Sequence, residues 1–159
     1  MTALTTLVGV VTGAALSRRS QQRQWSLDRQ TSACLAVLRE SSSLLVGLSV
    51  LSGRCSSSSA VPDWQAWNRT LAEVALVADH RIVEAANALD EEIWRVHLEV
   101  RRSPAPAEDW FERRERVEAA RLMFNEQVRQ KLTAPGPPLQ RIMGRPAPDD
   151  PVWDRPRLR

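Results

Sequence analysis

The stretch LAEVALVADHRIVEAANALDEEIWRVHLEV, residues 71–100, decides the fold expected of this chain. Its apolar residues recur at three- and four-residue steps, which is the spacing of one face of an α-helix. Two sets stand eleven residues apart: Leu71, Ile82 and Ile93, and Val74, Ala85 and Val96. Because an eleven-residue repeat keeps one face of a nearly straight helix apolar, we predict one helix of about 55 Å over residues 64–100. Asp79 suits the cap of a new helix and would introduce a kink.

The apolar face of this helix is the predicted packing surface. Its members are Leu71, Val74, Ile82, Leu89, Ile93 and Val96. The neighbouring segments are also helical in pattern: residues 18–52, with Cys34, Leu45 and Leu48, form a first packing helix that continues from the amino terminus. We therefore predict an all-α fold, in which a long N-terminal anchor helix packs with two further antiparallel helices as a helical hairpin or three-helix bundle.

Serines, glycines and prolines mark the ends of these elements. Residues 53–63 contain Gly53, four serines and Pro62, which predict a linker, and Pro104 and Pro106 end the long helix. The helical hairpin accordingly covers residues 64–132. Residues 133–159 hold seven of the ten prolines and have too few apolar residues to fold alone, so a disordered tail is expected.

The chain opens with TALTTLVGVVTGAALSRRSQQRQW, residues 2–25, in which no ionisable side chain precedes Arg18 and Arg19. Sixteen helical residues span about 24 Å. A bilayer core is about 30 Å thick, but arginines that reach toward the headgroups compensate for a short span. We predict a membrane anchor over residues 1–17.

Charge and small residues give this anchor a direction and a packing face. Four arginines follow the apolar run within twelve residues, so the amino terminus is expected outside and the remaining chain in the cytoplasm. Arg18, Arg19, Arg23 and Trp25 would then meet anionic lipid headgroups. Gly9 and Gly13 form a G-x-x-x-G pattern, which allows close approach of two helices in lipid.

Two other interpretations of the opening segment stay open. In the first, the chain is a soluble, cytoplasmic oligomer whose apolar N-terminus is a subunit interface. In the second, Gly9 and Gly13 drive assembly of the segment into a holin-like membrane lesion. All three interpretations involve a protein partner or self-association.

The sequence contains no motif that carries catalysis. His80 and His97 lie seventeen residues apart, and Cys34 and Cys55 are isolated, so neither a metal set nor a nucleophile with its base is present. We expect no enzyme activity, no catalytic residue, no cofactor, no metal and no small-molecule substrate. The net charge of +3 is not concentrated on one face, so nucleic acid is not an expected partner. The charged run ERRERVEAAR, residues 112–121, is predicted to face solvent.

Three features together carry a resemblance: an apolar N-terminus with Gly and Ala, the exit SRRSQQRQW, and a long helix with VADHRIVEAANAL. Over about residues 2–100 the chain resembles the uncharacterised small membrane-anchored helical proteins of high-GC Gram-positive bacteria. The resemblance implies a single-pass anchor and no particular activity.

Overall fold

The computed structural model describes residues 2–52, 62–102, 107–133 and 136–139, with the side chains of residues 2–17, 19 and 107–109 outside that description. The described residues form four helices, and the all-α prediction is confirmed. Their bounds are α1 Thr2–Leu51, α2 Trp64–Val77, α3 His80–Arg102 and α4 Ala107–Leu132.

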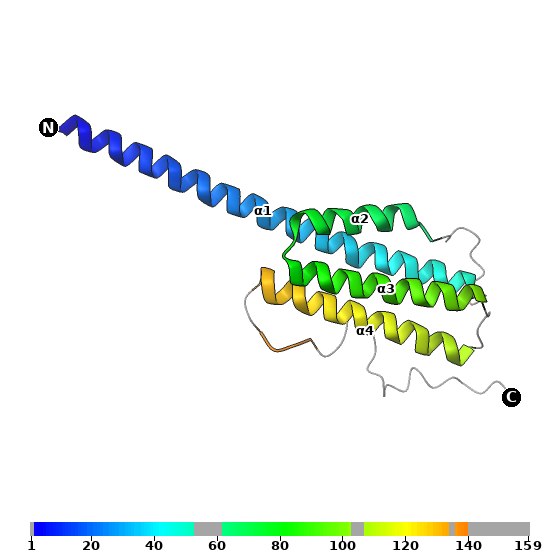
Figure 1. Ribbon diagram of the computed structural model, residues 1–159. Coiled ribbons are helices and arrows are strands. Elements are labelled where there is room, and N and C mark those ends of the chain that lie inside the picture. The colour runs from blue at the N-terminus through cyan, green and yellow to red at the C-terminus, as the bar shows by residue number, and fades with distance from the viewer. Residues whose placement is uncertain (1, 53–61, 103–106, 134–135, 140–159) are drawn as a thin grey trace.

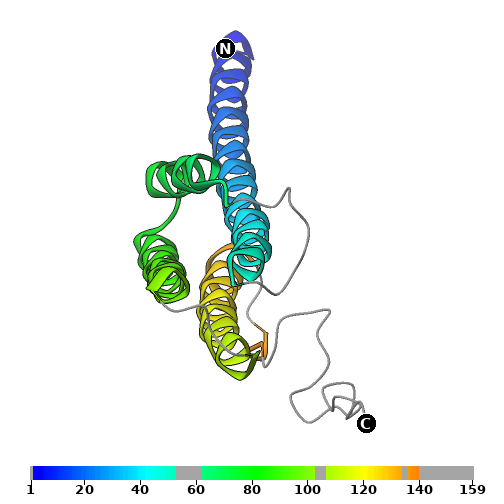
Figure 2. The same ribbon diagram turned by 90° about the vertical axis from the view of Figure 1, so that its right-hand side faces the viewer.

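The four helices form an antiparallel bundle from which α1 projects. Successive helices run in opposite directions in Figure 1, and the end-on view of Figure 2 shows them at the corners of a square. At about 1.5 Å per residue, α1 is about 75 Å long and far exceeds its neighbours. Its N-terminal part, residues 2–29, extends beyond the bundle and is called the projecting segment below.

The prediction of one helix across residues 64–100 is wrong, because the chain reverses at Ala78 and Asp79. Ala78 is extended, with φ −93° and ψ 161°, and its N–H still donates to the Val74 carbonyl. The Asp79 carboxylate accepts from the Arg81 N–H at 3.0 Å and caps α3. The structure therefore has a tight turn between two helices where the sequence predicted a continuous rod with a kink.

A hydrogen bond between α2 and α3 confirms the reversal. The Trp67 indole Nε1 donates to the Asp90 carboxylate at 2.6 Å. Trp67 lies eleven residues before Ala78, and Asp90 lies eleven residues after Asp79, as a hairpin centred on that turn requires. Trp67 is fully buried, so its ring packs in the core while its polar edge is satisfied by the next helix.

The core lies between the four helices and consists of apolar side chains from all of them. Its buried members are Ala33, Cys34, Val37, Leu44, Leu45, Leu48, Trp67, Val74, Ile82, Ala86, Leu89, Ile93, Val96, Val100, Trp110, Val117 and Phe124. Three other leucines of α1, namely Leu27, Leu35 and Leu51, are exposed. Leu27 lies on the projecting segment, and Leu35 faces away from the other helices.

Short polar contacts fix the chain at the ends of the helices. Asp63 caps α2 by accepting from the Ala66 N–H at 2.9 Å. The predicted linker 53–63 lies outside the described residues except for Pro62 and Asp63. After α4, the chain turns back along that helix, since the Leu139 N–H donates to Glu126 Oε2 at 3.1 Å and Arg129 Nη1 donates to the Pro137 carbonyl. The predicted disordered tail lies outside the described residues from 140 onward.

Candidate functional site

The projecting segment is the first candidate surface, because no other described helix covers it. Every described side chain from Ser20 to Arg29 is exposed, and so is Arg18. Trp25 leaves 63% of its surface exposed. In proteins most helical stability comes from packing of an apolar face against other elements. The described part of the projecting segment receives no such packing from α2, α3 or α4, so it is an open surface of the molecule.

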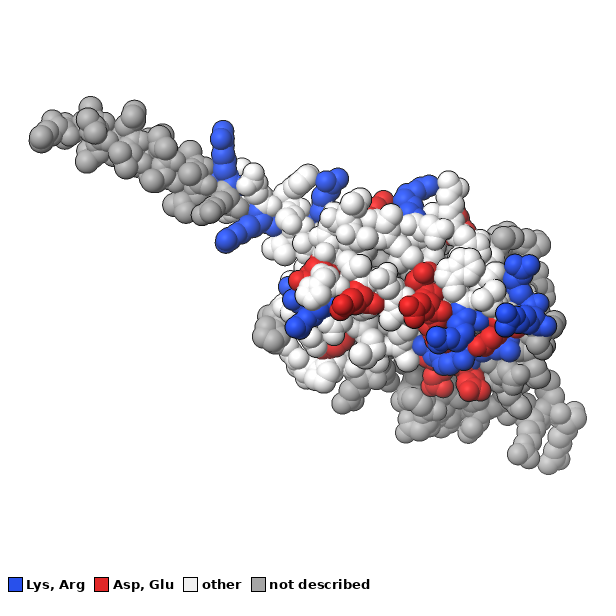
Figure 3. Space-filling model, in the orientation of Figure 1, with Lys and Arg blue, Asp and Glu red and all other residues white. Residues whose placement is uncertain are grey.

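The described part of this segment is rich in arginine. In Figure 3 its visible face carries blue Lys and Arg atoms and no red ones. The Arg29 guanidinium lies over the Trp25 ring, 4.7 Å from its centroid. This is a cation–π contact between two residues one helical turn apart. Gly9 and Gly13 lie in the helical backbone of α1. The Arg19 side chain, together with all contacts of residues 2–17, lies outside the described side chains.

Helix α1 also contains, near the N-terminus, a described stretch long and apolar enough to cross a membrane, Ser20–Leu51. Within this stretch, the side chains of Cys34, Val37, Leu44 and Leu48 belong to the bundle core. Those side chains already pack against α2, α3 and α4. We therefore assign the apolar character of this stretch to core packing and not to contact with lipid.

The predicted solvent-exposed run 112–121 instead joins helices. Arg113 Nε lies 3.1 Å from Glu99 Oε2, and Arg116 Nη2 donates to the same carboxylate at 2.7 Å. This hydrogen bond, followed by the nearby charges of Glu99 and Glu92, raises the pKa of Arg116 above its ordinary value. Arg116 Nε is also 3.1 Å from Glu92 Oε1, but neither atom has a well-directed hydrogen bond, so this contact is Coulombic. In Figure 3, blue and red atoms lie side by side over the right-hand part of the bundle.

Arg121, at the end of the same run, bridges α4 and α1. Its side chain is only 11% exposed and its Nη1 donates to the Glu118 carboxylate at 2.8 Å. Its other nitrogens donate to Ser41 Oγ at 3.0 Å, Ser42 Oγ at 2.6 Å and the Leu38 carbonyl at 3.2 Å. A charged side chain held in this way sets the register of the two helices.

An aromatic cluster that the sequence did not predict lies between α2 and α3. The Trp64 and Trp94 rings are stacked, with centroids 4.5 Å apart and an interplanar angle of 18°. His97 meets both rings edge-on, at 4.8 and 5.6 Å. Burial, reinforced by the positive charge of Arg101, lowers the pKa of His97 and favours the neutral imidazole. In sequence, the i,i+3 spacing of Trp94 and His97 was the only available signal, and Trp64 lies thirty residues away.

The residues predicted from the apolar repeat lie in the core and form no surface. Val74, Ile82, Leu89, Ile93 and Val96 are all fully buried, while Leu71 is partly buried against them. The structure brings them together from two antiparallel helices and not from one. His80 is exposed, and its Nδ1 lies 3.4 Å from the Asp79 carboxylate.

Within the described residues, no three side chains of His, Cys, Asp or Glu are grouped so as to hold a metal ion. Comparison of the chain with protein-family models, curated proteins and solved structures finds no match. The projecting segment and the surfaces of the bundle are therefore the candidate functional surfaces.

Proposed function

We propose that the protein is a membrane-tethered interaction module, in which the four-helix bundle is held at the cytoplasmic face of a membrane by the N-terminal part of α1. The observation that carries the proposal is the continuity of α1. One unbroken helix joins the bundle core to a segment that lacks ionisable side chains from Thr2 to Ser17. No rearrangement of the bundle is needed for that segment to enter a bilayer.

The residues that follow the apolar segment suit a membrane surface. Arg18, Arg23 and Arg29 are exposed, and each arginine near an anionic surface contributes about 1 kcal/mol of attraction. Trp25 has an apolar ring with a polar edge, which favours the region between hydrocarbon and water. Moving each arginine through a bilayer costs on the order of 3 kcal/mol, so the bundle should stay on the cytoplasmic side.

From Ser17 to Ala33, the first buried residue of the bundle, α1 rises about 24 Å at 1.5 Å per residue. This stretch acts as a stalk that holds the bundle away from the lipid headgroups. A bundle without a metal set or nucleophile in its described part, presented in this way, suits binding of another protein. We therefore propose a role in protein interaction and not in catalysis.

Membrane fractionation of the full chain tests the anchor. The protein should resist carbonate extraction and be released by detergent, and deletion of residues 2–17 should make it soluble. The deletion removes no described core residue, so its circular dichroism should stay helical. Deletion of the tail, residues 140–159, removes a segment of similar length and should leave the protein in the membrane.

The competing function is a soluble oligomer whose projecting helices pack on one another, and the same exposed segment favours it. That alternative predicts full-length protein in the soluble fraction as an oligomer, and a monomer after deletion of residues 2–17. If full-length protein is soluble without detergent, the membrane proposal is wrong.

A thiol test measures the orientation. Cys34 is buried, and burial raises the pKa of its thiol to about 11, so Cys55 is the reactive thiol at neutral pH. A membrane-impermeant maleimide should label Cys55 only after cell lysis, and a Cys55→Ser variant should not be labelled. Labelling of Cys55 in intact, wall-stripped cells would reverse the proposed topology.

A further inference from the structure

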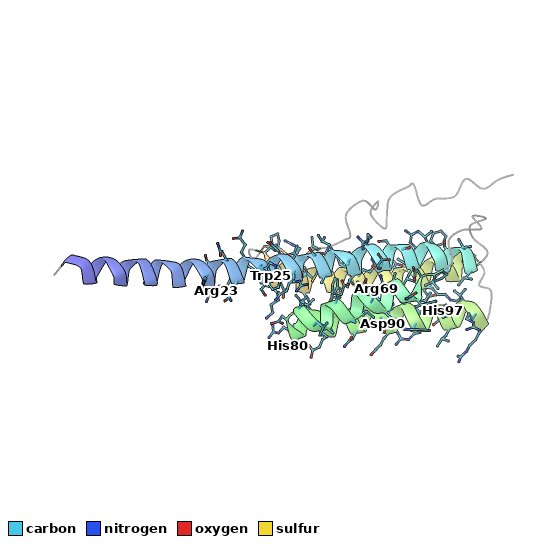
Figure 4. The ribbon with its side chains drawn as sticks, turned by 90° about the horizontal axis from the view of Figure 1, so that it is seen from above. Arg23, Trp25, Arg69, His80, Asp90 and His97 are labelled. Carbon is cyan, nitrogen blue, oxygen red and sulfur yellow. The ribbon has the colours of Figure 1, made fainter. Side chains whose placement is uncertain are left out.

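The aromatic cluster of Trp64, Trp94 and His97 lies toward the end of the bundle opposite the projecting segment, as the labelled His97 and Trp25 show in Figure 4. Trp94 leaves 39% of its surface exposed and Leu98, one turn further along α3, leaves 44% exposed. The cluster is therefore an apolar ridge on the surface between α2 and α3 that extends onto the outer face of α3.

His97 places an unsatisfied polar atom beneath this ridge. The residue is 8% exposed, and its Nδ1 has no hydrogen-bond partner. An unpartnered buried nitrogen costs about 1–3 kcal/mol, so native structures rarely keep one without a ligand or water to complete it. The neutral imidazole can donate one hydrogen bond from this position.

Stacked aromatic rings beside a hydrogen-bond donor are the features that recognise a polyproline II helix. Proline rings pack on flat aromatic faces, and the backbone carbonyls of this helix are free to accept hydrogen bonds. Arg101 and Arg102 are exposed in the last turn of α3, close to His97. The ridge therefore favours a proline-rich segment that also carries acidic residues.

We propose that this ridge binds the chain's own segment Pro148-Asp149-Asp150-Pro151, so that the C-terminal tail occupies an interaction surface of its own bundle. Polyproline II has three residues per turn, which places Pro148 and Pro151 on the same side, and the two aspartates between them can meet Arg101 and Arg102. The proposal does not depend on membrane attachment.

The length of the tail is sufficient. Leu139 is bonded to Glu126, and nine residues from there to Pro148 span about 28 Å in polyproline II. Along α4 the ridge lies near the level of Arg116, which contacts Glu92 and Glu99 on α3. That level is ten residues from Glu126, about 15 Å along the helix axis. Crossing to the neighbouring helix adds about 10 Å, so the segment reaches the ridge.

Paramagnetic broadening in the full-length protein tests the contact. A nitroxide is attached to Val152→Cys in a Cys55→Ser background, and the indole N–H signals are recorded by NMR. The Trp64 and Trp94 signals should lose intensity, whereas the Trp25 signal, on the projecting segment, should not. Broadening should be independent of dilution, as binding within one chain requires.

Two variant sets separate the proposed contact from general proximity. Pro148→Ala with Pro151→Ala should restore the Trp64 and Trp94 signals. Arg101→Asp with Arg102→Asp should also restore them, and adding Asp149→Arg with Asp150→Arg should bring the broadening back. Arg101 and Arg102 are exposed, and the tail substitutions change no described residue, so each variant should keep its helical circular dichroism.

Three outcomes would overturn the proposal. The first is full intensity of both indole signals in the labelled wild-type tail, and the second is broadening that persists without the two prolines. For the third, isotope-labelled protein without a nitroxide is mixed with spin-labelled protein. Broadening of its indole signals in that mixture would assign the contact to a second copy.

Discussion

Truncation of Leu89 tests the packing of α3 most directly. Leu89 is fully buried, in line with Ile82, Ile93 and Val96 on the core face of the helix. Glu91, two residues further along, is exposed on the same helix. Leu89→Ala and Glu91→Ala form a matched pair, because both end in the same side chain within the same turn of α3.

The expected magnitude follows from burial. Removing a fully buried leucine side chain costs lost transfer free energy and leaves a cavity, about 3 kcal/mol together. For a chain of this length that corresponds to a fall in Tm of about 6–12 °C. The Glu91→Ala change should stay within about 0.5 kcal/mol, as is usual for exposed positions. Leu89→Asp adds the cost of burying an unpaired carboxylate and should abolish cooperative unfolding.

Thermal unfolding followed by circular dichroism at 222 nm measures all three variants. Urea unfolding supplies the free-energy differences directly. Equal melting temperatures for the two alanine variants would mean that α3 presents a different face to the core. In that case the hairpin at Ala78 and Asp79 would also be misplaced, since both depend on the same register.

Three further predictions follow from buried polar groups. The pKa of His97 is lowered in the folded protein, so at pH values below about the ordinary pKa of 6.5 the unfolded chain binds the proton more readily than the folded chain does. The contribution of His97 to the free energy of unfolding should therefore be full at pH about 7.5 and fall toward pH about 5. His97→Phe should flatten this pH dependence, measured by urea titration at each pH. Equal pH dependence in the variant and the wild type would contradict the prediction. Arg121→Met should cost about 3 kcal/mol because Glu118 keeps a nearly buried charge, whereas the exposed Arg69→Met should be almost silent in the same assay. Maleimide should label Cys34 only in step with the loss of helical signal in denaturant, since its thiol is buried; rapid labelling of native protein would show that α1 leaves the bundle.

The candidate anchor could be predicted from the sequence because it depends on local composition. A run without ionisable side chains, followed by Arg18 and Arg19, can be identified without knowledge of any contact. The same is true of the ends of α1 and α3 at Leu51 and Arg102, close to the residues where Gly53 and Pro104 predict them. It is also true of the burial of Leu89 and Ile93, since a 3.6-residue period identifies one apolar face on each helix.

Only the tertiary structure decided the direction in which each helix runs and the helices against which it packs. The apolar period of residues 71–100 is unchanged whether the chain continues straight or turns back at Ala78, because a short turn preserves the spacing in sequence. The reversal is favoured because it lets α2 and α3 bury their apolar faces against the same core, which a rod of about 55 Å could not do within one chain.

The same reasoning explains the polar contacts that the sequence did not predict. Arg113 and Arg116 pair with Glu99 across two helices, although carboxylates four residues away offered local partners. Trp64 and Trp94 stack because the turn brings positions thirty residues apart to the same level. A sequence period specifies the face on which a side chain lies, whereas the residue opposite depends on where the neighbouring helix begins and in which direction it runs.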